Sequence, residues 1–273
     1  MFAGYMKIKP PLSVYERGIV EWDDASKQFQ KRSSFAPNTA AYPQGHPVRD
    51  PHGETDRNGE TDFIYFCKPL PFVRVPARAA DVLDLAAYET YSYLQHGSTR
   101  ADPRIDRGPD RKLRWSWKKD TVALTPELER QLVKDGKIAT DEQAFRLTSL
   151  DQDRMIALHG TSIAWNTRRQ RWIMIALERG GTASFLGEIH YSEAKRLLGP
   201  WSPAVKVVSH NKYSFYNPRL HPMFGQGRHV YFEGTYTQTF SAAKTATPRY
   251  DYTQIMYRLD VDRVGKLLSS TPP

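Results

Sequence analysis

Two acidic residues in the C-terminal part of the sequence are candidate catalytic carboxyls. Glu233 follows a strongly apolar run, precedes Gly234 and has Tyr and Thr neighbours that could orient it, and Asp251 lies between two tyrosines. Glycoside hydrolysis needs two carboxyl groups across the scissile bond, about 5 Å or about 6.5–9.5 Å apart. We therefore predict Glu233 as the acid and Asp251 as its partner. The alternatives are that Glu233 accepts a turn amide and that Asp251 is a partner for Arg249.

Two histidines occupy equivalent places in two parts of the sequence. His46 and His221 each precede a proline, and on the first strand of a repeated sheet they would face a shared central channel. We predict that they contact a ligand there, with a shared structural role in a turn as the alternative. Neither a His-x-x-x-His motif nor paired cysteines are present, so we predict no metal and no cofactor.

Other side chains suit the binding of a sugar. Flat aromatic faces cover the apolar C–H side of a pyranose, while amides bond to ring hydroxyls. On this basis Trp165, Asn166, Tyr216 and Asn217 are predicted substrate-binding residues. The alternative for Trp165 is packing between sheets. Arg74 lies in a valine-rich strand, and a buried arginine there would hold a carboxylate of the protein or of an acidic sugar.

Short strands must position these residues. Alternating apolar and polar residues predict antiparallel strands at 162–166, 171–177, 187–194 and 204–208. Four such strands in about 48 residues match one blade of a β-propeller. The pattern begins again at 215, with strands at 215–224, 229–237 and 253–261 and no fourth strand.

Similar units precede this pair. An incomplete blade is predicted first, with three strands at 5–9, 15–23 and 29–35. In the next blade, a single strand at 62–74 is predicted as the second strand. We predict an all-β fold, a single five-bladed type of propeller over residues 1–273, with about 3.5–4 blades present and an upstream portion missing. Its parts are a partial blade at 1–35, a blade at 41–119, a helical insert at 120–150, a blade at 155–210, a last blade at 211–262 and a tail at 263–273.

The insert carries helix signals. Thr125 followed by Pro126 reads as an N-cap with proline in the first turn. Leu128 and Leu132 lie on one face, and Gly136 would end the helix. Residues 140–143 predict a second short helix that begins with a capping box.

Composition limits the classes of partner. The 273 residues carry a net charge of +9 and a pI near 9.5, but basic and acidic residues are interspersed. The one basic-aromatic cluster, 111–119, fits a charged strand edge, so nucleic acid is not the expected partner. Cys67 is the only cysteine, which excludes an internal disulfide and suits a buried core thiol.

No stretch approaches the roughly 18 apolar residues of a membrane span, and residues 1–11 lack an apolar signal core. At face value the chain is cytoplasmic, and it is extracytoplasmic if it is an N-terminally truncated member of a secreted family. Its oligomeric state is not predicted.

Several motifs resemble a known family. They are WN at 165–166, RW at 171–172, GE at 187–188, LGPW at 198–201, FYNP at 215–218, HP at 221–222 and FEGTY at 232–236. Together they resemble uncharacterised bacterial proteins related to the five-bladed arabinanase and levansucrase-like glycosidases. That resemblance implies an Asp base on the first blade and a Glu acid on a later one. The first blade would lie upstream of Met1, so the base has no matching position here.

These observations predict a carbohydrate-active, glycoside hydrolase-like propeller that acts on a polysaccharide or oligosaccharide. The alternative is a non-catalytic propeller that binds a glycan or another protein through the same face. A basic nucleic-acid binder is the third, weaker option. The spacing of the carboxyl groups decides between the first two.

Overall fold

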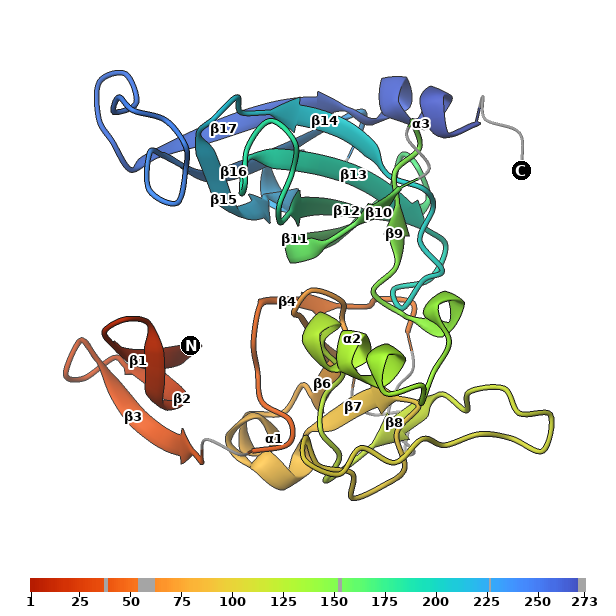
Figure 1. Ribbon diagram of the computed structural model, residues 1–273. Helices are drawn as coiled ribbons and strands as arrows, with labels where there is room; N and C mark the ends of the chain where they lie inside the picture. The colour runs from red at the N-terminus through yellow and green to blue at the C-terminus, as the bar shows by residue number, and fades with distance from the viewer. Residues whose placement is uncertain (37–38, 54–61, 152–153, 226, 270–273) are drawn as a thin grey trace. The chain divides into compact units, whose positions relative to one another are not determined.

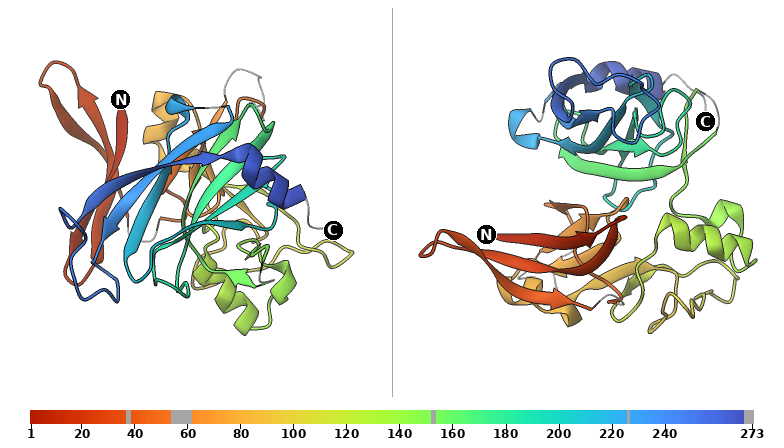
Figure 2. Two further views of the ribbon diagram at one scale, coloured as in Figure 1. Left: turned by 90° about the horizontal axis from the view of Figure 1, so that it is seen from above. Right: turned by 60° about the vertical axis from the view of Figure 1, so that its left-hand side comes forward.

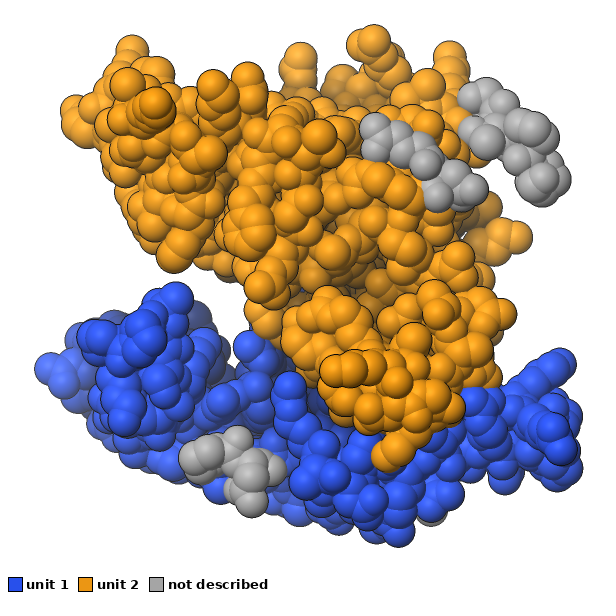
Figure 3. Space-filling view, viewed as in Figure 1, with its two compact units in different colours: residues 1–66, 72–124 blue, residues 67–71, 125–273 orange. Residues whose placement is uncertain are grey.

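The computed structural model describes residues 1–36, 39–53, 62–151, 154–225 and 227–269. The chain is mostly β, with 43% strand and 12% helix, and its strands form antiparallel sheets (Figure 1). The chain divides into two compact units (Figure 3). Unit 1 holds residues 1–66 and 72–124, and unit 2 holds residues 67–71 and 125–273.

Unit 1 contains two sheets. A three-stranded sheet occupies the predicted partial blade, in the order β1 (Phe2–Lys9), β2 (Ser13–Asp23), β3 (Gln28–Phe35). A five-stranded sheet has the order β4 (His46–Arg49), β5 (Phe63–Cys67), β6 (Val73–Pro76), β7 (Glu89–Ser92), β8 (Ser116–Lys118). Between β6 and β7 lie α1 (Ala79–Leu83) and a 3₁₀ turn (Leu85–Ala87).

The five-stranded sheet corrects one expectation. Residues 62–74 form two strands, β5 and β6, in place of one. Pro69 and Pro71 interrupt the run, because proline has no N–H to donate to a sheet ladder. The Lys68 N–H instead donates to the carbonyl of Leu70 across a tight turn, at 3.2 Å.

Unit 2 contains two sheets that the sequence predicts, the four-stranded sheet and the three-stranded sheet that follows it. The four-stranded sheet is β11 (Leu158–Asn166), β12 (Arg171–Glu178), β13 (Glu188–Ala194), β14 (Val205–Ser209). The three-stranded sheet is β15 (Ser214–Leu220), β16 (His229–Thr237), β17 (Thr253–Asp260), with a 3₁₀ turn (Pro222–Phe224) after β15. A two-stranded pair, β9 (Leu147–Thr148) and β10 (Met155–Ile156), precedes them.

The first strands of the two larger sheets of unit 2 lie next to each other. The backbone N–H of Leu220, at the end of β15, donates to Ser162 Oγ of β11 at 2.9 Å. Both sheets also share one core, in which Phe215 and Phe232 of the last sheet join Ile173 and Tyr191 of the other. The two sheets therefore form one packed body in which β11 and β15 are neighbours.

The central strands β12 and β13 are buried on both faces. Every residue of β13 is buried, and so is every residue of β12 except Arg171. An unbroken apolar run such as residues 172–177 is the signature of a strand that is covered on both sides. Polar side chains on these two strands must therefore find partners inside the protein.

The helical insert forms as predicted at its first helix. α2 (Pro126–Lys134) begins where Thr125 Oγ1 accepts the Leu128 N–H at 3.1 Å, and it ends before Gly136, which has a positive φ of 68°. The second predicted helix is only a 3₁₀ turn (Thr140–Glu142). None of the helices in the described ranges is long and apolar enough to cross a membrane.

Residues 263–269 of the predicted tail belong to a helix, α3 (Val261–Ser269), which continues directly from β17 (Figure 2). Val261 and Val264 of this helix are buried in the shared core. A Cβ on Gly265 would lie 2.3 Å from the guanidinium carbon of Arg169. Glycine at this position lets the arginine side chain cross the helix surface.

We expect Gly234→Ala to destabilise the protein by about 1–3 kcal/mol, the usual cost of overpacking a core. The added methyl would lie 2.5 Å from the ring of Phe215, which is fully buried. Gly160→Ala is the control, because nothing lies within 4 Å of a Cβ there. Urea denaturation of both variants tests this, and equal midpoints would contradict the packing described for Phe215.

Candidate functional site

Exposed aromatic side chains gather on the last sheet of unit 2. The Tyr216 ring lies edge-on to Tyr252 at 6.0 Å and to Phe240 at 6.1 Å, and the Tyr216 hydroxyl donates to that of Tyr252. Phe240, Tyr250 and Tyr252 are 54%, 76% and 58% exposed. We call Tyr216, Asn217, Phe240, Tyr250 and Tyr252 the aromatic patch.

The backbone of this patch is unusual. Asn217, Phe240 and Tyr252 have positive φ angles of 56°, 61° and 68°. Positive φ is tolerable for asparagine but is a genuine outlier for bulky residues. Asn217 lies where the register between β15 and β16 shifts, and its side chain is exposed. Residues held in such conformations are concentrated at ligand sites, where the surrounding structure imposes them.

Asp251 anchors the loop that presents the patch. Its Oδ1 accepts the Gln238 N–H at 2.8 Å and the Thr237 hydroxyl at 3.0 Å. These bonds favour the ionised form, so the Gln238 N–H first, and the Thr237 hydroxyl after it, lower the pKa of Asp251. The Asp251 carboxylate thus fastens the segment 238–252. Pairing with Arg249 was the alternative role considered from the sequence, and the bonds to Gln238 and Thr237 take its place.

Glu233 lies elsewhere on the same sheet. His221 Nε2 is 3.2 Å from Glu233 Oε1, within ion-pair distance but outside hydrogen-bond geometry. The two side chains are 14% and 32% exposed. The structure therefore brings the predicted acid to a histidine and not to a turn amide.

Two further predicted residues, Trp165 and Asn166, lie with His221 in the lining of one small pocket. The Asn166 amide is already occupied, because its Nδ2 donates to the Gly227 carbonyl at 3.0 Å and its Oδ1 accepts the Arg169 N–H at 2.8 Å. The Trp165 ring packs edge-on against Trp172 at 5.6 Å. Both contacts hold the β11–β12 turn and the sheet.

The two predicted catalytic carboxyls each have other partners. Thr237, which bonds Asp251, is four residues from Glu233 on β16, so these two strand positions are about 13 Å apart along the backbone. Asp251 is engaged in holding its loop, and Glu233 lies beside His221. Their roles as acid and partner stay predictions.

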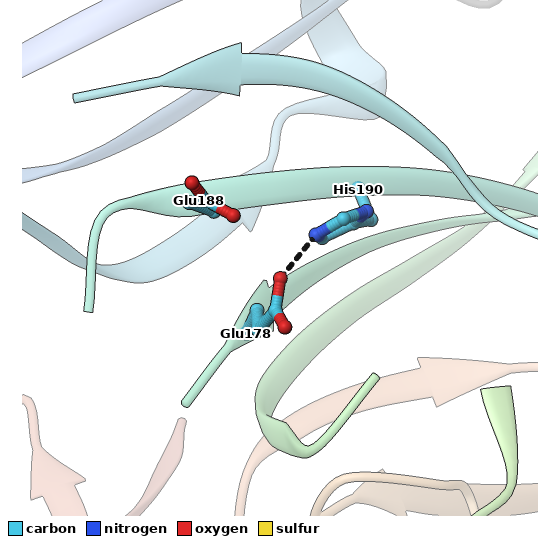
Figure 4. Close-up of side chains that lie close together, drawn as sticks. All are labelled: Glu178, Glu188 and His190. Atoms are coloured by element: carbon cyan, nitrogen blue, oxygen red, sulfur yellow. Dashed lines mark hydrogen bonds and ion pairs between the residues drawn. The ribbon is translucent and has the colours of Figure 1, made fainter. Parts of the chain in front are cut away.

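A different pair of carboxylates lies buried inside the four-stranded sheet. Register places Leu177 opposite Ile189, so Glu178 of β12 and Glu188 of β13 are neighbours on one face, and His190 Nε2 donates to Glu178 Oε2 at 2.8 Å (Figure 4). Arg154 donates to both oxygens of Glu178, with its Nη2 3.0 Å from Oε2. The sequence reasoning missed Glu178, although a glutamate that ends a continuous apolar run was a visible signal.

The contacts of Glu188 are structural. Its Oε1 accepts the Ala183 N–H at 3.0 Å, and its Oε2 accepts Lys206 Nζ at 3.3 Å. Glu178, Glu188 and His190 offer atoms within 4.8 Å of one another, the spacing of metal ligands. Arg154 and Lys206 already neutralise both carboxylates and would repel a cation, so the cluster does not suit a metal ion.

Unit 1 holds the remaining predicted residues. Arg74 is buried between the rings of Phe63 and Trp117, each 4.0 Å from the guanidinium carbon. Its Nε donates to Glu89 Oε2 at 2.8 Å, so this arginine holds a carboxylate of the protein. His46 begins β4 and is half-buried.

Unit 1 also contains a largely apolar cavity of about 510 Å³, a volume typical of ligand pockets. Arg17 covers the Tyr42 ring at its wall, 4.1 Å from the ring centroid, and Gln44 adds an amide. None of the residues predicted to bind sugar lines it.

No protein-family model matches this chain, and no curated protein matches it. Among solved structures, the chain is similar to a mutant levansucrase of Bacillus subtilis, with 9% sequence identity and a TM-score of 0.34. The match covers 95% of this chain and 63% of the levansucrase chain. A likeness of this degree carries no argument about activity.

The buried cluster predicts how stability depends on pH. Burial raises the pKa of Glu178, but hydrogen bonds from His190 and Arg154 outweigh burial and lower the pKa to about 2, from 4.5 when unperturbed. This group therefore stabilises the fold fully above about pH 4.5, and that contribution is lost as the pH falls from 4.5 toward 2.

We expect Glu178→Gln to flatten the pH dependence of the unfolding free energy in that window, by up to about 1.4 kcal/mol per pH unit. Glu127→Gln, on the exposed face of α2, is the control and should keep the wild-type slope. Urea titrations at several pH values measure the slopes. An unchanged slope for Glu178→Gln would show that its carboxylate has no lowered pKa.

Proposed function

We propose that this protein binds a carbohydrate through the aromatic patch, as a propeller-type glycan-binding protein. The observation that carries the proposal is the juxtaposition of the half-buried Tyr216 with Tyr252 and Phe240, both exposed and both edge-on to the Tyr216 ring. The exposed amide of Asn217 is beside Tyr216 in the sequence. Soluble proteins rarely leave contiguous large apolar side chains in water unless they meet a partner.

The chemistry of the patch favours a sugar over a purely apolar ligand. Its tyrosines combine a flat apolar face with a hydroxyl that can bond to a sugar hydroxyl. Asn217 adds two donors and an acceptor. The loop is also fixed by Asp251 before any ligand arrives, which lowers the entropy lost on binding.

Binding is favoured over hydrolysis by the contacts of the carboxyls. Glu233 has a histidine as its near neighbour, and Asp251 bonds Thr237 and the Gln238 N–H, which hold its loop. Glu178 and Glu188 are a close pair, but both are buried and neutralised by cations. That buried pair is not open to a glycosidic bond, which an acid and a base must flank.

The sheets are proposed to be propeller blades. Support comes from the consecutive antiparallel order of β11 to β14 and from the adjacency of β11 and β15 in unit 2. In a propeller the first strands of neighbouring blades lie side by side around a channel. Binding of a glycan near the start of β15 would then use the mouth of that channel.

We expect Tyr252→Ala to weaken binding of oligosaccharides by about 10-fold or more, the loss typical of removing a central aromatic contact. Tyr216→Phe keeps the ring but removes the hydroxyl bond, so it should have a smaller effect. Tyr15→Ala, an exposed tyrosine in unit 1, is the control. A glycan array followed by calorimetry measures the affinities. If no glycan binds, or if Tyr15→Ala loses as much as Tyr252→Ala, the proposal fails.

We further expect that wild-type protein releases no reducing sugar from any glycan it binds, and that Glu233→Gln binds with unchanged affinity because Glu233 lies outside the patch. Reducing-end assays on the glycans found by the array test this. Release by wild type that is abolished in Glu233→Gln would replace the binding proposal with the hydrolase one.

A further inference from the structure

Unit 2 has a second concave site, away from the aromatic patch. A cavity of about 740 Å³ lies where β13 ends and the chain turns toward β14. It is closed on one side by the end of α3, through Leu268 and Ser269. We call it the corner pocket. The lining residues used below are Arg169, Arg171, Glu193, Lys195, Arg196 and Trp201.

The charge of the corner pocket is strongly positive. Four cationic side chains, Arg169, Arg171, Lys195 and Arg196, line it together with one carboxylate, Glu193. Arg169 already bonds both oxygens of Glu193, at 2.8 and 3.1 Å. The positive charges of Arg171, Lys195 and Arg196 are therefore left to attract an anion from solution.

The Trp201 indole also lines the corner pocket. Within the described part of the chain, its Nε1 is buried and has no hydrogen-bond partner. Because that nitrogen is closed off from water, it is not open to a ligand in the pocket. The indole therefore offers its half-buried ring, and not its N–H, to the site.

We propose that the corner pocket binds the acidic groups of a glycan, carboxylate or sulfate, so that the ligand of this protein is an acidic polysaccharide. The proposal rests on the glycan-binding function and names its substrate class. Arginine and lysine suit both kinds of oxyanion, and arginine binds them through paired N–H groups. The flat indole of Trp201 offers a face for the sugar ring that carries the anion.

A glycan fits the pocket better than a nucleic acid does. Non-specific nucleic-acid binding needs cations that follow the phosphate backbone along an extended groove. Here the cations converge on one concave corner of limited volume. Such a site accommodates one or two charged sugar units.

Isothermal titration calorimetry of the full chain tests the proposal with four probes: polygalacturonate for carboxylates, dextran sulfate for sulfates, unmodified dextran, and a duplex DNA oligonucleotide. We expect at least one acidic glycan to bind about 10-fold or more tightly than dextran, a difference of about 1.4 kcal/mol. Its affinity should fall as salt rises, because the anion's counterions are released on binding.

Two variants locate that binding. Lys195→Gln combined with Arg196→Gln should weaken the acidic glycan about 10-fold and reduce its salt dependence. Trp201→Ala removes the aromatic ring from the pocket wall, so it should weaken binding severalfold. The matched control is Lys112→Gln with Lys119→Gln, which removes two exposed charges from unit 1 and should leave the affinity unchanged. Circular dichroism confirms that each variant is folded.

The proposal is overturned if both acidic glycans bind no tighter than dextran, if the control double variant loses as much as the pocket variant, or if DNA binds as tightly as the acidic glycan. Failure of the glycan-binding function itself gives a different result, because then no glycan of any charge binds. Conversely, if dextran or another neutral glycan binds and Tyr252→Ala abolishes it while acidic groups add nothing, only the corner-pocket inference is wrong.

Discussion

Burial of both faces of β12 and β13 is the constraint on which the rest of unit 2 depends. With no water on either side, every polar side chain on these strands needs a partner within the protein. Glu178 meets His190 and Arg154, Glu188 meets Lys206, and Glu193 meets Arg169. Arg154, Lys206 and Arg169 come from outside these two strands, so their segments are thereby tied to the sheet. One of them, Arg169, lines the corner pocket together with Glu193.

The aromatic patch is held in place by hydrogen bonds and not by burial. It combines Tyr216 and Asn217 of β15 with the long β16–β17 connection, which exposes Phe240, Tyr250 and Tyr252. The loop is ordered instead by hydrogen bonds to one carboxylate, Asp251. Backbone conformations that bulky residues normally avoid are maintained there. A rigid sheet that carries a fixed polar loop is a common way to present a binding surface.

Local signals in the sequence were sufficient to predict many of the helices and strands. Apolar alternation placed the strands of unit 2, and Thr125 with Gly136 bounded α2, because both features depend on neighbours along the chain. Residues 62–74 were misread because an apolar run outweighed its two prolines. The helix α3 was taken for a tail, although Val261 and Val264 have the spacing of a buried helical face.

The site was less predictable because its contacts are made between distant residues. Tyr216 and Asn217 were recognised by type, but their neighbours, Phe240 and Tyr252, are set by the path of a long loop. Asp251 was recognised as a carboxylate, yet its role depends on Gln238, thirteen residues earlier. Arg154 with Glu178 shows the same limit, since the two residues are twenty-four apart in the chain.

Gly265 gives α3 a significance beyond closing the core. The guanidinium of Arg169 crosses the helix at that glycine and reaches Glu193 in the corner pocket. Attachment of α3 to the sheet and the orientation of this arginine are therefore coupled equilibria. Thermodynamic reciprocity requires that a ligand or contact that fixes the Arg169 conformation also stabilises the docked state of α3. Fraying of α3 destabilises that arginine conformation by the same coupling free energy.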